Sequence, residues 1–302
     1  MKTTYDCIPC FIRQALDAVR LATSDEKIHE QVLRGVLAAA STMNLDQSPP
    51  VMGQYIHKLI RELSGHDDPY KKLKDRFNNF ALTLYPDLKQ RIQRSSNPMD
   101  TAVRMAIAGN IIDFGVNSEL NRTVVSDTIE QALSAQVFGN IEILCDSINS
   151  AENILYLGDN CGEIVFDRLL IEQLPVQKVT FVVRGGPIIN DATMADARET
   201  GMTGLVHVMD NGSNIPGTVL EKCSKKFRQC FADADLIIAK GQGNFESLSG
   251  VSSNIFFLLK VKCSVIAEHV GLAQAIEPAL HFQIVPCRRE SSDRRRSLAR
   301  EL

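Results

Sequence analysis

The chain has 302 residues, enough for one large domain or two ordinary domains with a buried core. Its net charge of −3 gives no overall basic surface for nucleic acid. No apolar run reaches the roughly 20 residues of a membrane span, and the first residues lack a signal-peptide pattern. We therefore expect a cytoplasmic protein with no membrane segment and with reduced thiols at its eight cysteines.

Residues 1–150 carry one helical pattern after another. Apolar residues recur three and four apart from Ile8 to Ala22, and Asp25 offers an N-cap for a second helix. Later helices are expected to begin at Pro49-Pro50, at Asp68-Pro69, at Asn97-Pro98 and at a capping box of Asp127 and Glu130, the last one running through Val137. The pattern predicts an all-helical region over 1–150.

From about residue 151, short apolar runs alternate with helical stretches such as 163–174. Strands are expected at 153–157, 179–183, 205–208, 236–239 and 255–259. This alternation predicts an α/β fold over 151–287, a Rossmann-like and mostly parallel sheet with helices on both faces. The last segment, 288–302, has six Arg and three acidic residues, and we expect a poorly ordered basic tail.

Polar residues follow three of these strands directly. The segments are Gly-Asp-Asn-Cys-Gly-Glu at 158–163, Arg-Gly-Gly-Pro-Ile-Ile-Asn-Asp-Ala-Thr at 184–193 and Lys-Gly-Gln-Gly-Asn-Phe-Glu at 240–246. Any one of them also fits an ordinary turn or helix cap. In an open parallel sheet, however, ligands bind beyond the carboxyl ends of the strands. Three such segments at one edge therefore favour a ligand site.

The residue types at this edge suit metal and phosphate chemistry. Two carboxylates and an amide carbonyl match a hard cation such as Mg²⁺ or Mn²⁺, and we expect it at Asp159, Asn160 and Asp191. A lysine and two glycines that expose backbone N–H groups match a phosphate, which we expect at Lys240, Gly241 and Gly243. Together they predict phosphoryl chemistry.

These segments resemble the metal-dependent damage-control phosphatases, long catalogued as domain-of-unknown-function family eighty-nine. The resemblance extends to Pro216-Gly217-Thr218 and to the opening Cys7-Ile8-Pro9-Cys10, which is typical of a subfamily with an N-terminal CxxC. It implies a helical region on a Rossmann-like domain and hydrolysis of small phosphorylated metabolites, such as sugar phosphates or damaged phosphometabolites. From residue 274 on, the sequence differs from the family pattern.

Carried onto this sequence, the resemblance assigns a divalent metal to Asp159, Asn160 and Asp191, and phosphate to Lys240. The metal is expected to be Mg²⁺, Mn²⁺ or another first-row ion such as Co²⁺ or Ni²⁺. We expect Asp159, Asp191 and Lys240 to be catalytic, either by positioning a water or with one aspartate as the nucleophile. The residues expected to contact substrate are Asn110, Asp113, Arg184, Gly241, Gly243, Asn244 and Glu246.

Some alternatives remain open at this point. Asn110 and Asp113 lie three apart on one helix face, which fits a core or capping role as well as substrate contact. Cys7 and Cys10 fit packing thiols best, although metal or redox roles remain. An S-adenosylmethionine-dependent carboxyl methyltransferase is the runner-up function, but the turn at Gly158 lacks the G-x-G-x-x-G pattern. A non-catalytic metabolite-binding protein is the other alternative.

Overall fold

The computed structural model describes residues 1–109, 122–135, 137–271 and 282–287. Asn110, Asp113 and the basic tail at 288–302 therefore lie outside the described residues. The helices are α1 (Cys7–Ala22), α2 (Glu26–Thr42), α3 (Pro49–Ser64), α4 (Lys71–Arg94), α5 (Pro98–Gly109), α6 (Arg122–Ser134), α7 (Ile141–Ser150), α8 (Glu163–Ile171), α9 (Met194–Glu199), α10 (Lys225–Asp233), α11 (Gly241–Leu248) and α12 (Ser264–His269).

The strands form a single sheet within the described ranges. They are β1 (Val137–Phe138), β2 (Ile154–Leu157), β3 (Val179–Val183), β4 (His207–Asp210), β5 (Leu236–Lys240), β6 (Ile255–Lys260) and β7 (Phe282–Cys287). Their order is β1-β7-β6-β5-β2-β3-β4, and only the β6–β7 pair is antiparallel. After β2, the next two strands in the chain, β3 and β4, lie on one side of it. The strands that follow them, β5, β6 and β7, lie on the other side. The switch point lies between β2 and β5, which is where open α/β sheets bind ligands.

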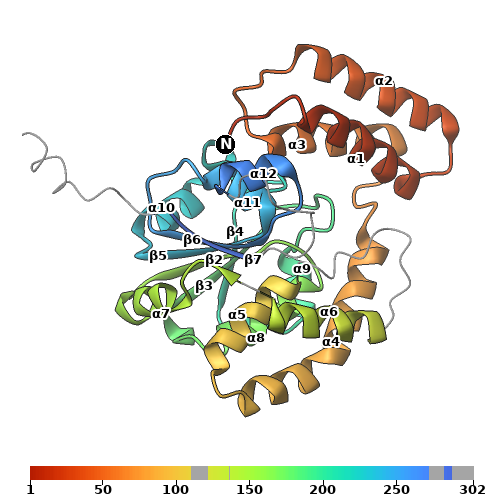
Figure 1. Cartoon of the computed structure of the whole chain (residues 1–302). Helices are drawn as coiled ribbons and strands as arrows, with labels where there is room; N and C mark the ends of the chain where they lie inside the picture. Colours follow the sequence, from red (N-terminus) through yellow and green to blue (C-terminus); the bar gives the residue numbers. More distant parts are fainter. Residues whose placement is uncertain (110–121, 136, 272–281, 288–302) are drawn as a thin grey trace, which may run out of the picture.

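Helices cover both faces of the sheet, as the sequence predicted (Figure 1). Successive strand residues point to opposite faces. Tyr156 and Phe256 therefore share a core with α4–α8, whereas Leu157 and Phe257 share a core with α10–α12. The central strands are buried on both faces, which explains why they read as unbroken apolar runs.

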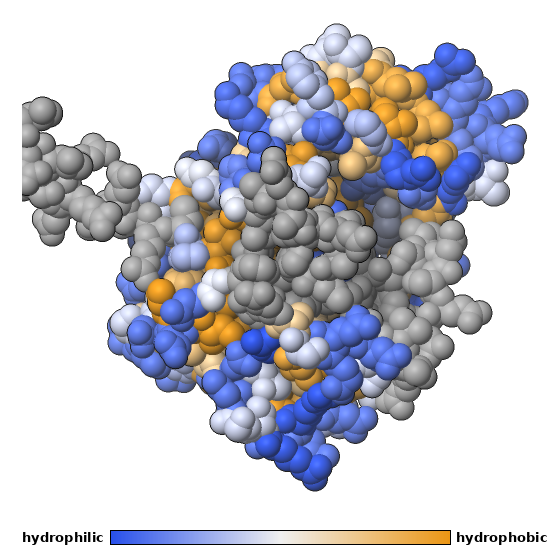
Figure 2. All heavy atoms as spheres, viewed as in Figure 1, coloured by the Kyte–Doolittle hydropathy of each residue, from blue (hydrophilic) through white to orange (hydrophobic). Residues whose placement is uncertain are grey.

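Helices α1–α3 form a separate layer with its own core, set apart from the sheet in Figure 1. Phe11, Val36 and Ile56 are among its buried residues. On the face shown in Figure 2, apolar residues also gather on the surface of this layer. No described helix is both long and apolar enough to traverse a bilayer.

The all-helical pattern predicted for residues 1–150 is wrong at one point. Val137 lies in β1 rather than in a helix, because it pairs with Phe282 of β7, a partner that no local pattern reveals. The predicted capping box also fails, since α6 already begins at Arg122 and Asp127 lies inside it. Helices α4–α7 share a core with one face of the sheet, whereas α1–α3 have a core of their own.

Two other boundaries moved for local reasons. Strand β4 begins two residues later than predicted, because the backbone N–H groups of Leu205 and Val206 both donate to Met202 O in a turn. Helix α4 begins at Lys71 rather than at Pro69, because Asp68 Oδ1 accepts from the N–H of Tyr70 and forms a separate turn first.

A buried ion pair fastens α4 to the sheet domain. Lys74 is 2% exposed, and its Nζ lies 3.0 Å from Asp196 Oδ2 on α9. One turn further along α4, Asn78 Nδ2 donates to Asp196 Oδ1 and Asn78 Oδ1 accepts from the N–H of Gly162. Helix α4 is thereby tied to the turn that follows β2.

Replacing Lys74 with Ala should lower the free energy of unfolding by about 3–5 kcal/mol, because Asp196 would stay buried without its cation. Urea denaturation followed by circular dichroism measures the change. Lys72→Ala is the matched control: Lys72 is exposed on the same helix, and its loss should cost less than about 0.5 kcal/mol. Equal effects of the two substitutions would contradict the role given to the ion pair.

Candidate active site

A pocket of about 590 Å³ lies where the carboxyl ends of the central strands face the α1–α3 layer. The sheet contributes Asp159 and Asn160 after β2, and Asp191 from the loop after β3. Helix α11, which follows β5, contributes Gln242, Gly243 and Glu246, and the opposite wall comes mainly from the starts of α1 and α3. All three segments in which site residues were predicted, 158–163, 184–193 and 240–246, thus contribute to one pocket.

Backbone contacts hold the loops after β2 and β3 together. Asn160 and Asp191 form an isolated antiparallel bridge, and Asp159 O accepts from the N–H of Ala192 at 2.8 Å. The N–H of Cys161 donates to Asn190 O, also at 2.8 Å. The side chains predicted to bind a metal therefore project from a paired and fixed backbone.

Arg184 joins the two aspartates. Its Nε donates to Asp191 Oδ2 at 2.6 Å, and its Nη2 lies 3.5 Å from Asp159 Oδ1. Arg184 and Asp191 are buried, at 2% and 3% exposure. The sequence predicted a substrate contact for Arg184, whereas here it orients the carboxylates and binds Thr218 and Asn244 behind them.

The two carboxylates experience a strongly unfavourable electrostatic environment. Burial raises the pKa of Asp159 well above its usual range, and the charge of Asp191 adds to the effect. Arg184 and Lys262 oppose this rise in the pKa of Asp159 without cancelling it. Burial likewise raises the pKa of Asp191, although Arg184 limits the rise. Excess negative charge at low dielectric favours a cation at this position.

Gly241 allows the closest approach between the β2 and β5 segments. It has a left-handed φ of +76°, and a Cβ at this position would clash with Asp159 Oδ2. Any side chain here would be strained and would displace the carboxylate. Gly241 was predicted to contact the substrate. In the structure it does not line the pocket, and its role is to leave room for the Asp159 carboxylate.

Lys240 lies away from the pocket. It is fully buried, and its Nζ donates to Ala106 O at 2.7 Å, to Glu163 Oε1 at 2.7 Å and to Asp167 Oδ1 at 2.5 Å. Burial alone would lower the pKa of Lys240, but Asp167 and Glu163 raise it overall, so the lysine stays charged. An ammonium group has three protons, so this arrangement leaves none for a phosphate, contrary to the expectation from sequence.

The remaining predicted contacts divide into two groups. Gly243 and Glu246 line the pocket, and burial raises the pKa of Glu246 to about 7. Asn244 is fully buried and instead braces the loops, donating to Lys240 O and Gly158 O and accepting from Thr218.

Two residues with a clear place at the site were missed from the sequence. Lys262 lines the pocket and its charge acts on Asp159. It follows β6, so the rule used for the other strand ends would have found it. Glu163 lies behind Asn160, with Oε2 accepting from Asn160 Nδ2 at 3.1 Å. The charge partner of Glu163 is 77 residues away in the chain, and no local pattern predicts that pairing.

Cys7 and Cys10 stand at the start of α1 and line the same pocket, together with Cys263. Cys7 is half-buried and Cys10 is exposed, and both are free thiols. The favoured interpretation of the motif was a pair of packing thiols. The exposure of Cys10 does not fit that role. Burial raises the pKa of the Cys263 thiol.

The side chains predicted to bind a metal at the pocket carry oxygen donors. In the part of the chain that the structure describes, no group of three or more His, Cys, Asp or Glu side chains is arranged to hold a metal. The pocket offers instead two carboxylates and the Asn160 amide, which is a donor type outside that set. This set suits a hard divalent cation rather than a soft one.

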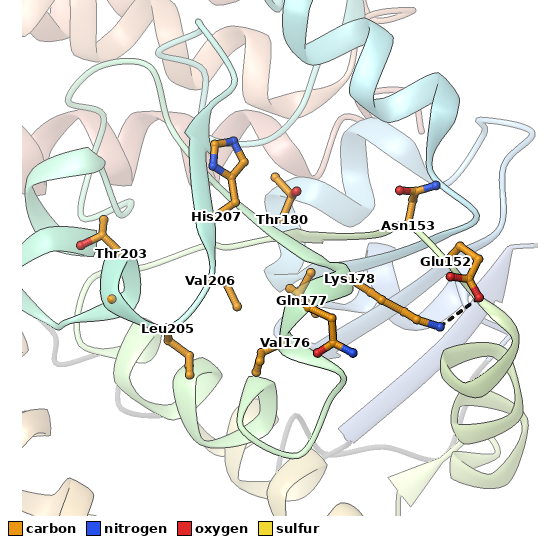
Figure 3. A pocket seen from close by; sticks show the side chains of 12 residues that line it. Glu152, Asn153, Val176, Gln177, Lys178, Thr180, Thr203, Leu205, Val206 and His207 are labelled. Carbon is orange, nitrogen blue, oxygen red and sulfur yellow. Dashed lines mark hydrogen bonds and ion pairs between the residues drawn. The ribbon is translucent and has the colours of Figure 1, made fainter.

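A second pocket, of about 510 Å³, lies at the opposite edge of the sheet (Figure 3). Its lining includes residues that precede the strands, such as Asn153 before β2 and Val206 before β4. Its charged pair, Glu152 and Lys178, lies 3.1 Å apart and largely neutralises itself. This edge therefore lacks the concentration of carboxylates found beyond β2 and β3.

Comparison with known proteins places these features in a family. Residues 3–276 match the model of the damage-control phosphatase ARMT1-like domain. The chain is 35% identical over 278 residues to "Damage-control phosphatase PH1575" of Pyrococcus horikoshii, covering 89% of this chain and 94% of that protein. It is 33% identical over 281 residues to a "Damage-control phosphatase" of Archaeoglobus fulgidus, covering 90% and 96% respectively.

A solved structure agrees with the fold. The crystal structure of a DUF89 family protein from Pyrococcus horikoshii superposes with a TM-score of 0.86 at 32% identity. The alignment covers 95% of this chain and all of that one.

Proposed function

The chain belongs to the damage-control phosphatase ARMT1-like family, and on that premise we propose that it hydrolyses phosphate esters of small metabolites at the pocket between β2, β3 and α11. The observation that carries the proposal is the convergence of Asp159, Asn160 and Asp191 on a pocket of metabolite size. The expected substrates are sugar phosphates or damaged phosphometabolites. The predicted cytoplasmic location, the lack of a nucleic-acid partner and the CxxC subfamily stay predictions.

Asp159, Asn160 and Asp191 are the proposed ligands of a divalent cation, Mg²⁺ or Mn²⁺ or another first-row ion. The fit is supported by the hard oxygen donors and by the raised pKa of Asp159, which reflects burial and then the nearby charge of Asp191. Such an ion supplies charge neutralisation for the phosphoryl group and lowers the pKa of a bound water.

The chain's own residues prepare the site for this chemistry. Arg184 fixes the orientation of Asp191 and Asp159 through its ion pairs. Helix α11 begins at Gly241, and its first backbone N–H groups have no partner within the helix. Gly243 lines the pocket, which supports the proposal that the N–H groups around it donate to phosphate oxygens. Hydrolysis breaks the bond between phosphorus and the alcohol oxygen, which leaves with a proton. Water supplies that proton and the oxygen that replaces the alcohol, either by direct attack or after one aspartate has taken up the phosphoryl group.

Lys262 is our candidate for the lysine that binds the phosphate group, in place of Lys240. Lys262 lines the pocket and lies near enough to Asp159 for its charge to act on that carboxylate. Lys240, by contrast, gives its three protons to buried acceptors. A lysine at the pocket wall is suited to neutralise a phosphate dianion.

Among the described residues, no feature of the pocket favours either of the two alternative functions, an S-adenosylmethionine-dependent methyltransferase and a pure binding protein. Neither alternative explains why Asp159 and Asp191 lie close together at the pocket with raised pKa values. Titration calorimetry with S-adenosylmethionine distinguishes the first alternative, and a phosphatase assay distinguishes the second.

Metal removal and aspartate substitution test the proposed function. Dialysis against a chelator should abolish hydrolysis of p-nitrophenyl phosphate or a sugar phosphate, and Mn²⁺ or Mg²⁺ should restore it. Asp159→Asn and Asp191→Asn should each reduce kcat/KM by about 10²–10³-fold or more, since each weakens the cation's stabilisation of the transition state. Asparagine keeps the size of the side chain and limits damage to the fold. Activity that survives both chelation and these substitutions would refute the assignment.

Lys262→Ala should lower kcat/KM by about 10–100-fold, mainly through KM, because a charged hydrogen bond of roughly 1.5–3 kcal/mol to the phosphate is lost. The control is Lys178→Ala, which removes a positive charge at the opposite edge of the sheet (Figure 3). It should leave both kinetic constants near those of the wild type. Identical kinetics for Lys262→Ala and the wild type would remove Lys262 from the phosphate site.

A further inference from the structure

Glu163 links the buried lysine to a proposed metal ligand. It is the first residue of α8 and is 2% exposed. Its Oε1 accepts from Lys240 Nζ at 2.7 Å, and its Oε2 accepts from Asn160 Nδ2 at 3.1 Å. One carboxylate therefore joins Lys240, at the end of β5, to Asn160, in the turn after β2.

The Asn160 amide is held in one orientation by two carboxylates. Besides Glu163 Oε2, its Nδ2 also donates to Asp159 Oδ2 at 2.9 Å. An amide turned by a half rotation would set Oδ1 against these two carboxylate oxygens, which repel it. Only the orientation with Nδ2 on the carboxylates satisfies both, and it leaves Oδ1 as the amide atom for a ligand. Oδ1 is also the atom that a hard cation binds.

Lys240 reduces the free-energy cost of burying the Glu163 carboxylate. An ionised carboxylate buried without a counter-charge is costly, and Lys240 supplies the counter-charge to Glu163 at full burial. Asp167 binds the same ammonium group at 2.5 Å and is equally buried. Asp167 accepts hydrogen bonds from Lys240 and Tyr156, whereas the Asn160 amide donates to Glu163 and Asp159.

We propose that Glu163, held by Lys240, is a positioning residue that turns the Asn160 amide so that Oδ1 faces the metal. Lys240 then acts through Glu163 and does not contact the phosphate itself. The inference rests on the metal assignment of the proposed function, and it gives a role to Glu163, which is not among the predicted site residues.

The substitution Glu163→Gln tests it with little change in shape. Lys240 only donates, so the new amide oxygen should stay on Lys240 and the new NH₂ group should face Asn160. That donor opposes Asn160 Nδ2 and favours the turned amide, which presents NH₂ to the metal. We expect Mn²⁺ affinity, measured by calorimetry on the metal-free full chain, to fall by about 10–100-fold.

Asp167→Asn is the matched control, because it removes one charge from the same lysine without touching Asn160. Its Mn²⁺ affinity should stay within about twofold of the wild type. A double-mutant cycle adds a second readout: in an Asn160→Ala background, Glu163→Gln should change the affinity less than about twofold, since the residue acts through Asn160. Thermal unfolding of each variant is recorded alongside. If Glu163→Gln does not fold, Glu163→Asp replaces it, because the shorter side chain keeps the charge but loses its reach to Asn160.

The outcomes separate this inference from the function on which it rests. Wild-type Mn²⁺ affinity in Glu163→Gln, or equal losses in Glu163→Gln and Asp167→Asn, overturns the positioning role and leaves the phosphatase assignment standing. A wild-type chain that binds no divalent metal, and hydrolyses phosphate esters without one, overturns the metal assignment and the inference together. A selective loss in Glu163→Gln that disappears in the Asn160→Ala background supports the positioning role.

Discussion

The burial of Asp159 and Asp191 beside each other is the constraint around which this site is built. Carboxylates taken out of water disfavour their own charge and repel one another, and the raised pKa of each reflects burial before any other cause. Arg184 relieves part of this repulsion through its contacts with both. The remaining unfavourable interaction between the two carboxylates would be relieved by a bound cation. Carboxyl groups with strongly raised pKa values that lie together in one pocket are typical of a functional site.

The fold brings these charges together by its topology. Chain order changes direction between β2 and β5, so the turns that follow these neighbouring strands open onto one crevice. Gly241 lets the β5 segment pass against Asp159, and Asn78 on α4 holds the N–H of Gly162 in the turn after β2. The starts of α1 and α3 then form the far wall of the pocket. The pocket therefore lies between the sheet edge on one side and a separate helical layer on the other.

Local patterns were enough to predict five of the seven described strands and the mostly parallel sheet, but neither β1 nor β7. The strand ends at Leu157 and Val183 are visible as apolar runs that stop at Gly158 and Arg184, and parallel strands necessarily share an edge. What failed depended on partners remote in sequence. Val137 pairs with Phe282, and Lys240 finds Glu163 and Asp167 rather than the pocket. The local sequence around a lysine at the end of a strand is the same whether its ammonium group faces solvent or the interior. The orientation of the side chain therefore becomes known only from the packed structure.

The most direct measurement is a crystal structure of the protein grown with Mn²⁺, using anomalous scattering to locate the ion. The account predicts a single strong anomalous peak in the pocket, with oxygen atoms of Asp159, Asn160 and Asp191 at about 2.0–2.3 Å, close to the distances of hard divalent ions. An occupied site elsewhere, or no peak between these side chains at saturating Mn²⁺, would contradict it.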